Sequence, residues 1–226
     1  MNRSSADDDA LPSREHHEGG FRPMTELTAA HEAAKNSDIT RGGPHYGQFI
    51  EQVRGLMDRV RLASPSDDLA MEAIGMLKQL NDKLDDAMVD EWSTPTWTRF
   101  DLPARGNITL PPYTIDHIDK QGLQARLTFR TFHLGGNNAA HGGQIAVAFD
   151  DLLGMAAAVH AGAVTRTASL TTDYRSITPL NTDLTAHAWV EQQEGRKLHL
   201  RATLHDGERL CAEARALFIV LKVGQP

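Results

Sequence analysis

The sequence predicts an α+β protein in which an antiparallel sheet of about five to six strands wraps around one long helix. Strand-like runs follow one another with hairpin signals between them, so neighbouring strands should run antiparallel. One stretch, from Ile145 to Ala163, is too apolar for a solvent-exposed helix, although Asp150, Asp151 and His160 interrupt it. We therefore expect this stretch to be a helix buried by the sheet, and not a membrane span.

The strand-like runs lie on both sides of this helix. Two precede it, at residues 107–116 and 123–132, and four follow it, at residues 168–174, 183–192, 197–205 and 210–223. Asp206-Gly207 is a strong two-residue hairpin signal, and Glu194-Gly195-Arg196 marks a second turn. The runs therefore favour a sheet built largely from hairpins.

Composition divides the chain into three segments. Residues 1–43 are rich in Ser, Asp, Glu, Gly and His, so we expect a disordered tail. Residues 44–95 carry apolar residues at helical spacing around a break at Ser64-Pro65-Ser66, which predicts two amphipathic helices and a linker, with Ser66 as an N-cap. The apolar faces of these helices need a partner, either the downstream domain or another subunit. Residues 96–226 should form the main domain.

Charge and cysteine usage exclude some classes of function. The formal net charge of −7 argues against a generally basic nucleic-acid binder. Cys211 is the only cysteine, so no intrachain disulfide forms, and a cytoplasmic location fits. The first residues lack the apolar core of a secretory signal peptide. His16 and His17 have no third ligand placed beside them, so we expect no metal site.

A glycine-rich segment at residues 135–143 opens the predicted helix. The first N–H groups of a helix have no partner within it, and the helix dipole favours negative charge there. Glycines let another group approach the backbone closely, so the segment can hold an anion or a developing oxyanion. The alternative is that the glycines only form a loop, and the residues by themselves favour this alternative.

The two adjacent aspartates of the helix are the other candidate site. A carboxylate in an apolar helix is costly unless it is hydrogen-bonded, paired or solvated, and carboxylates in clefts are candidates for general bases or nucleophiles. The alternative is that one aspartate pairs with an arginine while the other faces water. Because adjacent residues lie about 100° apart around a helix, at most one of them points into a given pocket.

Spacing along the helix predicts more than one subunit. Gly142 and Asp150 are eight residues apart, which corresponds to roughly 12 Å along the axis. Catalytic groups must lie within about 3–3.5 Å of the reacting atoms. One helix does not easily bring both groups to one carbonyl, whereas two copies packed across a symmetry axis do. We therefore expect a homodimer or homotetramer with composite active sites.

The order of motifs resembles a known family. His141-Gly142-Gly143, followed after six residues by Asp150 and then by Gly154, resembles the central helix of the PaaI-like hotdog-fold thioesterases. Further motifs follow in the same order at residues 167–170, 174–175, 179–180, 194–197 and 213–219. The set is most similar to the THEM-type acyl-CoA thioesterases, over residues 100–222. The resemblance implies hydrolysis of a fatty or aryl acyl-CoA thioester to the free carboxylic acid and CoA, without a metal or redox cofactor.

The resemblance also implies roles for the residues of the helix. Asp150 would be the general base or the nucleophile. The N–H of Gly142, with that of Gly143, would polarise the thioester carbonyl. His141 would fix the loop or donate a hydrogen bond near that carbonyl, and Thr167 would orient the attacking water or Asp150.

Contacts to the substrate are implied in two further places. Polar and basic residues that match CoA contacts of the family are Asp173, Arg175, Arg196 and Lys197. Cationic side chains suit the phosphates of CoA, whereas Asp173 would repel them unless it is paired; the alternative for each is a solvated surface charge. Many relatives carry an asparagine six residues before the histidine, where this chain has Gly135, so Asn137 or Asn138 is the candidate substitute.

Two other classes of function use the same fold. The domain could bind acyl-CoA without catalysis, or it could be a protein-interaction module with a helical N-terminus. The glycine-rich helix start together with Asp150 favours the enzyme, because a pure binder needs no carboxylate beside the thioester.

Overall fold

The structure, a computed structural model, describes residues 40–222 and begins with a helical extension. Helices α2 (Tyr46–Leu62) and α3 (Asp67–Asp85) are followed by three short 3-10 helices, η1 (Glu91–Ser93), η2 (Pro95–Trp97) and η3 (Pro103–Gly106). The Ser66 side chain accepts a hydrogen bond from the Leu69 N–H at 3.3 Å, so Ser66 is the N-cap of α3. The predicted pair of helices is present, with this cap between them.

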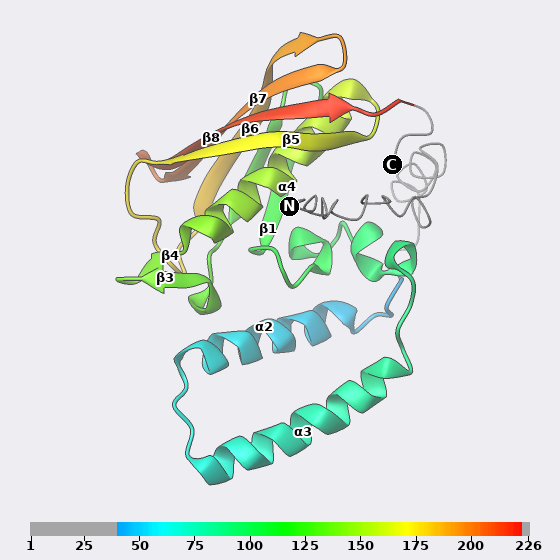
Figure 1. The fold of residues 1–226 in the computed structure, drawn as a ribbon, viewed down its shortest axis with the longest axis vertical. Helices are drawn as coiled ribbons and strands as arrows, with labels where there is room; N and C mark the ends of the chain where they lie inside the picture. Colours follow the sequence, from blue (N-terminus) through cyan, green and yellow to red (C-terminus); the bar gives the residue numbers. More distant parts are fainter. Residues whose placement is uncertain (1–39, 223–226) are drawn as a thin grey trace, which may run out of the picture.

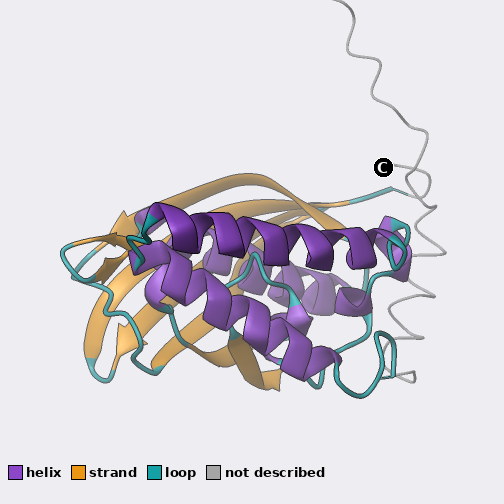
Figure 2. Ribbon diagram, turned by 90° about the horizontal axis from the view of Figure 1, so that it is seen from below, coloured by secondary structure: helices purple, strands orange, loops and turns teal. Residues whose placement is uncertain are grey.

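Six strands form one antiparallel sheet in the order β1-β2-β6-β7-β8-β5. The strands are β1 (Tyr113–Ile118), β2 (Leu123–Leu127), β5 (Thr165–Tyr174), β6 (Leu184–Glu194), β7 (Lys197–Asp206) and β8 (Arg209–Val220). Between β2 and β5 lie η4 (Thr131–His133), the short strands β3 (Leu134–Gly136) and β4 (Ala139–Ala140), and helix α4 (Gly142–Ala161). This order confirms the expected fold class, since the sheet curves around α4 (Figures 1 and 2).

Helix α4 supplies the centre of the core. Seven of its residues are buried, among them Ile145, Phe149, Leu152 and Leu153. They pack against inward-facing strand residues such as Leu200. Within the described chain, α4 is also the one helix long and apolar enough to cross a membrane. Because the sheet covers it, α4 is the core helix that the sequence predicts and not a span.

The structure corrects three expected boundaries. The first strand begins at Tyr113, because Pro111 and Pro112 before it lack the N–H that a ladder needs. The second ends at Leu127, and η4 follows it. The glycine-rich segment does not open the helix along its whole length: its first six residues form the β3–β4 hairpin, and α4 begins at Gly142.

Helix α2 is anchored to the main domain by charged side chains. Arg54 is buried and donates hydrogen bonds to the carbonyls of Pro103 and Asn107, at 3.2 and 3.0 Å. Asp58 pairs with Arg130, at 2.7 Å.

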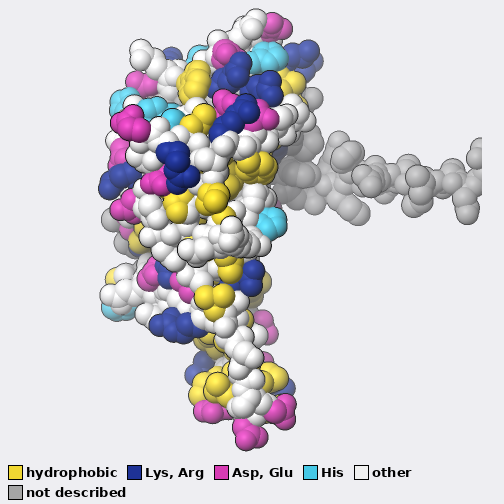
Figure 3. Space-filling view, turned by 90° about the vertical axis from the view of Figure 1, so that its left-hand side faces the viewer, with side chains coloured by type: hydrophobic (Ala, Val, Ile, Leu, Met, Phe, Trp, Pro, Cys, Tyr) yellow, Lys and Arg dark blue, Asp and Glu magenta, His cyan; other side chains and the backbone are white. Residues whose placement is uncertain are grey.

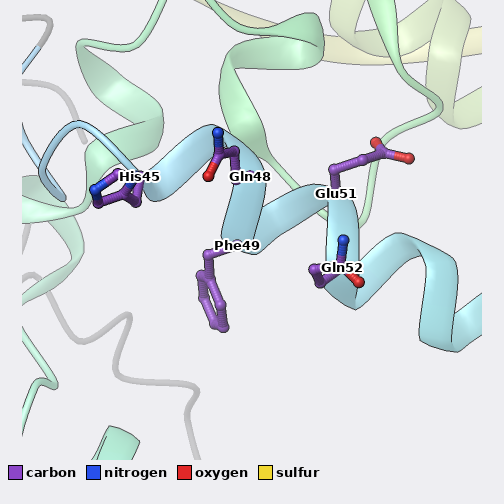
Figure 4. Close-up of a pocket in the computed structure, with 5 residues that line it drawn as sticks. All are labelled: His45, Gln48, Phe49, Glu51 and Gln52. Atoms are coloured by element: carbon purple, nitrogen blue, oxygen red, sulfur yellow. The ribbon is translucent and has the colours of Figure 1, made fainter.

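The exposed face of α2 bears a hollow of about 410 Å³ near its N-terminus, lined by His45, Gln48, Phe49, Glu51 and Gln52 (Figure 4).

Helix α3 lies beyond α2 (Figure 1), and none of its residues is buried by the described chain. Its exposed apolar side chains include Ile74, at 59% exposure, and Met76, at 61%. Figure 3 shows hydrophobic side chains exposed at the lower end of the molecule, among acidic side chains.

Of the segment expected to be disordered, residues 1–39 lie outside the described range. The carbonyls of Arg41 and Gly43 accept hydrogen bonds from Arg99.

Asp151 ties α4 to the segment that precedes β1. Arg105 of η3 approaches its carboxylate with two nitrogens, at 2.9 and 3.2 Å, and the Tyr113 hydroxyl donates to the same group. Burial raises the pKa of Tyr113, so this hydroxyl keeps its proton as a donor. The alternative expected for one of the two adjacent aspartates was an ion pair with an arginine, and Asp151 makes that ion pair.

His133, the last residue of η4, is 1% exposed. Its Nδ1 accepts the Arg130 N–H at 2.8 Å, and its Nε2 has no hydrogen-bond partner among the described residues. Burial lowers its pKa from 6.5 to about 4. The ring is therefore neutral at physiological pH. It packs against Phe132 with 3.9 Å between the ring centroids and an angle of 37° between the ring planes.

Removal of the Asp151 carboxylate should destabilise the fold. In Asp151→Ala, Arg105 and Tyr113 lose their acceptor in a partly buried place, and we expect the free energy of unfolding to fall by about 2 kcal/mol. Urea denaturation followed by circular dichroism measures this loss. Asp116→Ala is the control, because its pair with Arg126 is exposed and should leave stability unchanged within error. Equal behaviour of the two variants would contradict the anchoring role.

Acid should weaken the fold through His133. Because its pKa is lower in the folded state, the unfolded chain binds the extra proton between pH 6.5 and about 4. The contribution of His133 to the free energy of unfolding is therefore intact above pH 6.5. It is lost as the pH falls through this window, which lowers the free energy of unfolding by up to about 3 kcal/mol. Urea denaturation at a series of pH values should show a shallower slope for His133→Gln than for the wild type. His187→Gln, at an exposed position, should keep the wild-type slope.

Candidate functional site

One stripe of α4 is left uncovered by the sheet. It contains Gly143, Val147 and Asp150, all exposed, whereas the neighbouring Ala148 and Phe149 are buried. The Thr167 hydroxyl on β5 donates a hydrogen bond to the Asp150 carboxylate at 2.9 Å. No other hydrogen-bond partner of Asp150 is found within residues 40–222. The carboxylate that the resemblance selects is thus the solvated one, held by the threonine that the resemblance selects.

A β-bulge places Thr167 on the helix side of the sheet. Leu170 and Tyr174 of β5 face α4, and strict alternation would put Ala168, not Thr167, on that face. The register between β5 and β8 shifts between Thr167 and Ser169, so Ala168 is the extra residue. The bulge turns Thr167 inward and brings it within hydrogen-bond distance of Asp150.

The N-terminus of α4 forms a second group of candidate residues. His141 is the N-cap, and its Nδ1 accepts the Gly143 N–H at 3.0 Å. The backbone N–H of His141 donates to the His133 carbonyl at 2.8 Å. The N–H of Gly142 has no acceptor among the described residues, as is usual at the first helical position. Of the two N–H groups expected to polarise a carbonyl, the one on Gly142 is free and the one on Gly143 is occupied by His141.

Tyr174 explains why residue 142 is a glycine. Its hydroxyl donates to the Gly142 carbonyl at 2.9 Å, and a Cβ on residue 142 would lie only 2.9 Å from the tyrosine ring. Gly135 is needed for a similar reason, because its Cβ would lie 2.7 Å from the Cα of His141. Sequence reasoning assigned no role to the Tyr174 side chain, since its contact depends on how β5 crosses the helix start.

The chain brings the candidate residues together as two separate groups. One pairs Asp150 with Thr167 in the middle of α4, and the other gathers His141, Gly142 and Gly143 at its start. Gly142 and Asp150 lie eight residues apart within one continuous helix, about 12 Å along its axis. Within one chain, each group is half of the site that the resemblance implies.

Two of the four expected CoA contacts lie on the far side of the sheet from α4. Because Tyr174 faces the helix, its neighbours Asp173 and Arg175 point outward. Arg175 donates to Glu213 at 2.7 Å, and Asp173 pairs with Arg215 at 3.2 Å. Asp173 is therefore neutralised, which offsets the repulsion expected for a phosphate, but neither residue is brought near Asp150 of its own chain.

The other two expected contacts lie at the turn between β6 and β7. Arg196 and Lys197 are both exposed, and Arg196 donates to the Val220 carbonyl at 3.1 Å. Lys197 and Arg166 pair with the same β8 residue, Ile219, so the two cations share the outer face. Sequence reasoning missed Arg166, because its neighbourhood depends on strand register. Figure 3 shows Lys and Arg interspersed with Asp and Glu over the upper part of the molecule.

The candidate asparagines lie at an exposed hairpin tip. Asn137 and Asn138 have φ angles of 49° and 57°, which form the two-residue turn between β3 and β4. The hairpin projects from the body of the domain (Figure 1). Within residues 40–222, neither side chain makes a hydrogen bond to Asp150 or His141, so the structure explains both residues first by the turn that they form.

Within residues 40–222, no group of three or more His, Cys, Asp or Glu side chains is arranged to hold a metal ion. His16 and His17 lie outside the described residues. The hollow on α2 involves neither α4 nor β5 (Figure 4), so it is separate from both groups of candidate residues.

Comparisons with known proteins bear on the family that this chain resembles and on its fold. Residues 137–213 match the family model of the thioesterase superfamily. Over 83 residues the chain is 41% identical to the acyl-coenzyme A thioesterase THEM4 of Xenopus laevis, covering 36% of this chain and 37% of the relative. The chain thus spans well under half the length of that curated relative. The crystal structure of RHA08564, a thioesterase superfamily protein, superposes with a TM-score of 0.66 over 77% of this chain and 94% of that one, at 22% identity. Residues 137–213 therefore resemble the thioesterase superfamily, and the described domain has the hotdog fold.

Proposed function

We propose that this protein hydrolyses acyl-CoA thioesters to a free carboxylic acid and CoA. The hydrogen bond between Thr167 and Asp150 is the observation that carries the proposal, because it orients a solvated carboxylate on the one uncovered stripe of the core helix. The acyl-coenzyme A thioesterase that is 41% identical over 83 residues supports the choice of thioester. The proposed reaction uses no metal or redox cofactor.

Asp150 acts as the general base, or attacks the carbonyl itself as the nucleophile. In the first route it takes a proton from water while the water oxygen bonds to the thioester carbon. The C–S bond then breaks, and the proton passes from Asp150 to the departing CoA sulfur. Thr167 donates to one carboxylate oxygen and so leaves the other oriented for the water. The exposure of Asp150 suits this role, because water must reach the carboxylate.

The N–H of Gly142 stabilises the oxyanion that forms on the carbonyl oxygen. It has no acceptor among the described residues, lies at the positive end of the α4 dipole, and needs no rearrangement to receive the charge. His141 holds this turn of the helix through the Gly143 N–H. Because Asp150 of the same chain lies roughly 12 Å further along the helix, the active unit joins the Asp150 group of one copy to the Gly142 group of a second.

The face that meets the second copy is supported by two features. Strand β5 is an edge strand of ten residues whose outer backbone groups have no strand beside them in the described chain. It lies beside the uncovered stripe of α4, as the contact between Thr167 and Asp150 shows. Pairing of two such faces gives a homodimer with two equivalent sites, and a further pairing gives a homotetramer.

Basic side chains at the rim of this face bind the phosphates of CoA. Arg196 and Lys197 lie at the end of the sheet where β5 begins, with Arg166 beside them. Arg175, although paired with Glu213, retains half of its side-chain exposure. A cytoplasmic location is consistent with the single buried thiol, Cys211.

A panel of short-, medium- and long-chain and aryl acyl-CoAs, with a thiol-trapping dye, tests the activity. Thiol release above background on at least one of them is the expected result. Binding without any release would instead favour a non-catalytic acyl-CoA binder.

Loss of the Asp150 charge should remove most of the turnover. We expect Asp150→Asn to lower kcat by about 10²–10⁴-fold, because an amide cannot accept the proton from water. Steady-state kinetics and circular dichroism on the same samples separate catalysis from folding. Asp151→Asn is the matched control on the next residue, and its kcat should stay close to that of the wild type. Turnover near the wild-type rate in Asp150→Asn would defeat the assignment.

A mixture of two inactive variants should regain activity if the sites lie between copies. Asp150→Asn and His141→Ala each disable both sites of their own dimer. When the two are unfolded together and refolded, random pairing makes about half of the dimers mixed, and each mixed dimer has one intact site. We expect about a quarter of the wild-type turnover. If each chain formed its own site, no activity would return.

A further inference from the structure

Arg130, just before η4, is held by two carboxylates from α2. Its Nε and one terminal nitrogen donate to Asp58, at 2.9 and 2.7 Å, and its other terminal nitrogen donates to Glu51. The arginine side chain is 19% exposed and Asp58 is 22% exposed. The two N–H groups converge on one carboxylate oxygen in a place partly shielded from water. Such a pair fixes the position of a side chain more firmly than an exposed ion pair does.

The same aspartate also holds the backbone of η4. Its second oxygen accepts the Phe132 N–H at 3.1 Å. At the end of α2, Arg61 donates to the Leu134 carbonyl at 2.9 Å. Helix α2 therefore constrains the chain on both sides of His133, the buried residue at the end of η4.

His133 connects this clamp to the start of α4. Its ring nitrogen accepts the Arg130 N–H, and its carbonyl accepts the His141 N–H, both at 2.8 Å. His141 in turn caps α4 through the Gly143 N–H. A continuous series of hydrogen bonds thus runs from the Asp58 carboxylate, through η4 and His141, to the helix turn that contains Gly142.

We propose that Asp58 of α2 is a positioning residue for the reaction, which holds the Gly142 N–H at the helix start through η4 and His141. The inference rests on the proposed function, because it assigns the purpose of the helical extension to the oxyanion-stabilising half of that site. Misplacement of a catalytic donor by about 1 Å costs up to 10²-fold in rate. Asp58 does not touch the reacting atoms and acts only through the residues that it holds.

Asp58→Asn tests the proposal, because it keeps the size of the side chain and removes the charge that holds Arg130. We expect kcat to fall about tenfold while KM changes less than twofold, since an oxyanion donor acts mainly in the transition state. Hydrogen–deuterium exchange followed by mass spectrometry should show faster exchange in residues 133–145.

Arg54→Met is the matched control on the same helix. It removes the bonds of α2 to the Pro103 and Asn107 carbonyls and leaves the hydrogen bonds of Asp58 in place. We expect a lower melting temperature with kcat and the exchange of residues 133–145 unchanged. If Arg54→Met lowers kcat as much as Asp58→Asn does, α2 only stabilises the fold and the proposal is wrong.

Failure of this proposal differs from failure of the proposed function. If the wild type hydrolyses no acyl-CoA, the function fails, while the exchange measurement still decides whether Asp58 holds the helix start. Unchanged exchange in folded Asp58→Asn overturns the proposal in either case. Should Asp58→Asn not fold, Arg130→Lys keeps the positive charge but loses the fork, and the same loss of kcat and faster exchange are expected.

Discussion

Burial of α4 by the curved sheet is the constraint on which the rest of the structure depends. The helix is apolar on most of its surface, so the sheet must cover it. A six-stranded sheet with β5 as its last strand leaves one stripe uncovered. Asp150 lies on this stripe, which keeps its carboxylate solvated beside Thr167 without the cost of burying an unpaired charge. Asp151, one residue on, points to the segment before β1 and is neutralised there by Arg105.

The two halves of the proposed site are supported by different parts of the chain. The Asp150 half depends on the sheet, because the bulge in β5 turns Thr167 toward the helix. The Gly142 half depends on the loop before α4, on His133 within it, and on α2 behind it. This division gives the helical extension a physical role within the domain.

The charged residues of the outer sheet face are arranged differently from those of the site. Asp173 and Glu213 are neutralised by two arginines, Arg175 and Arg215. Arg201 pairs with Glu191 in the same way. Exposed pairs of this kind contribute little to stability. They do reduce the local repulsion of an anionic ligand near β5, since Asp173 and Glu213 each have a basic partner.

Periodicity and turn chemistry are local properties, so the sequence by itself determined the long apolar helix, the six main strands and the two helices of the extension. The order of motifs selected Asp150 and Thr167, which the structure joins by a hydrogen bond. The start of the first strand after Pro111 and Pro112 is a local signal that the strand pattern alone overlooked. The β3–β4 hairpin and the 3-10 turns, in contrast, depend on contacts with the rest of the chain. Only the tertiary structure decided which aspartate pairs with an arginine and which residues surround Gly142. These outcomes depend on contacts between residues more than thirty positions apart, such as Tyr174 with Gly142 and Arg105 with Asp151, which no local pattern encodes.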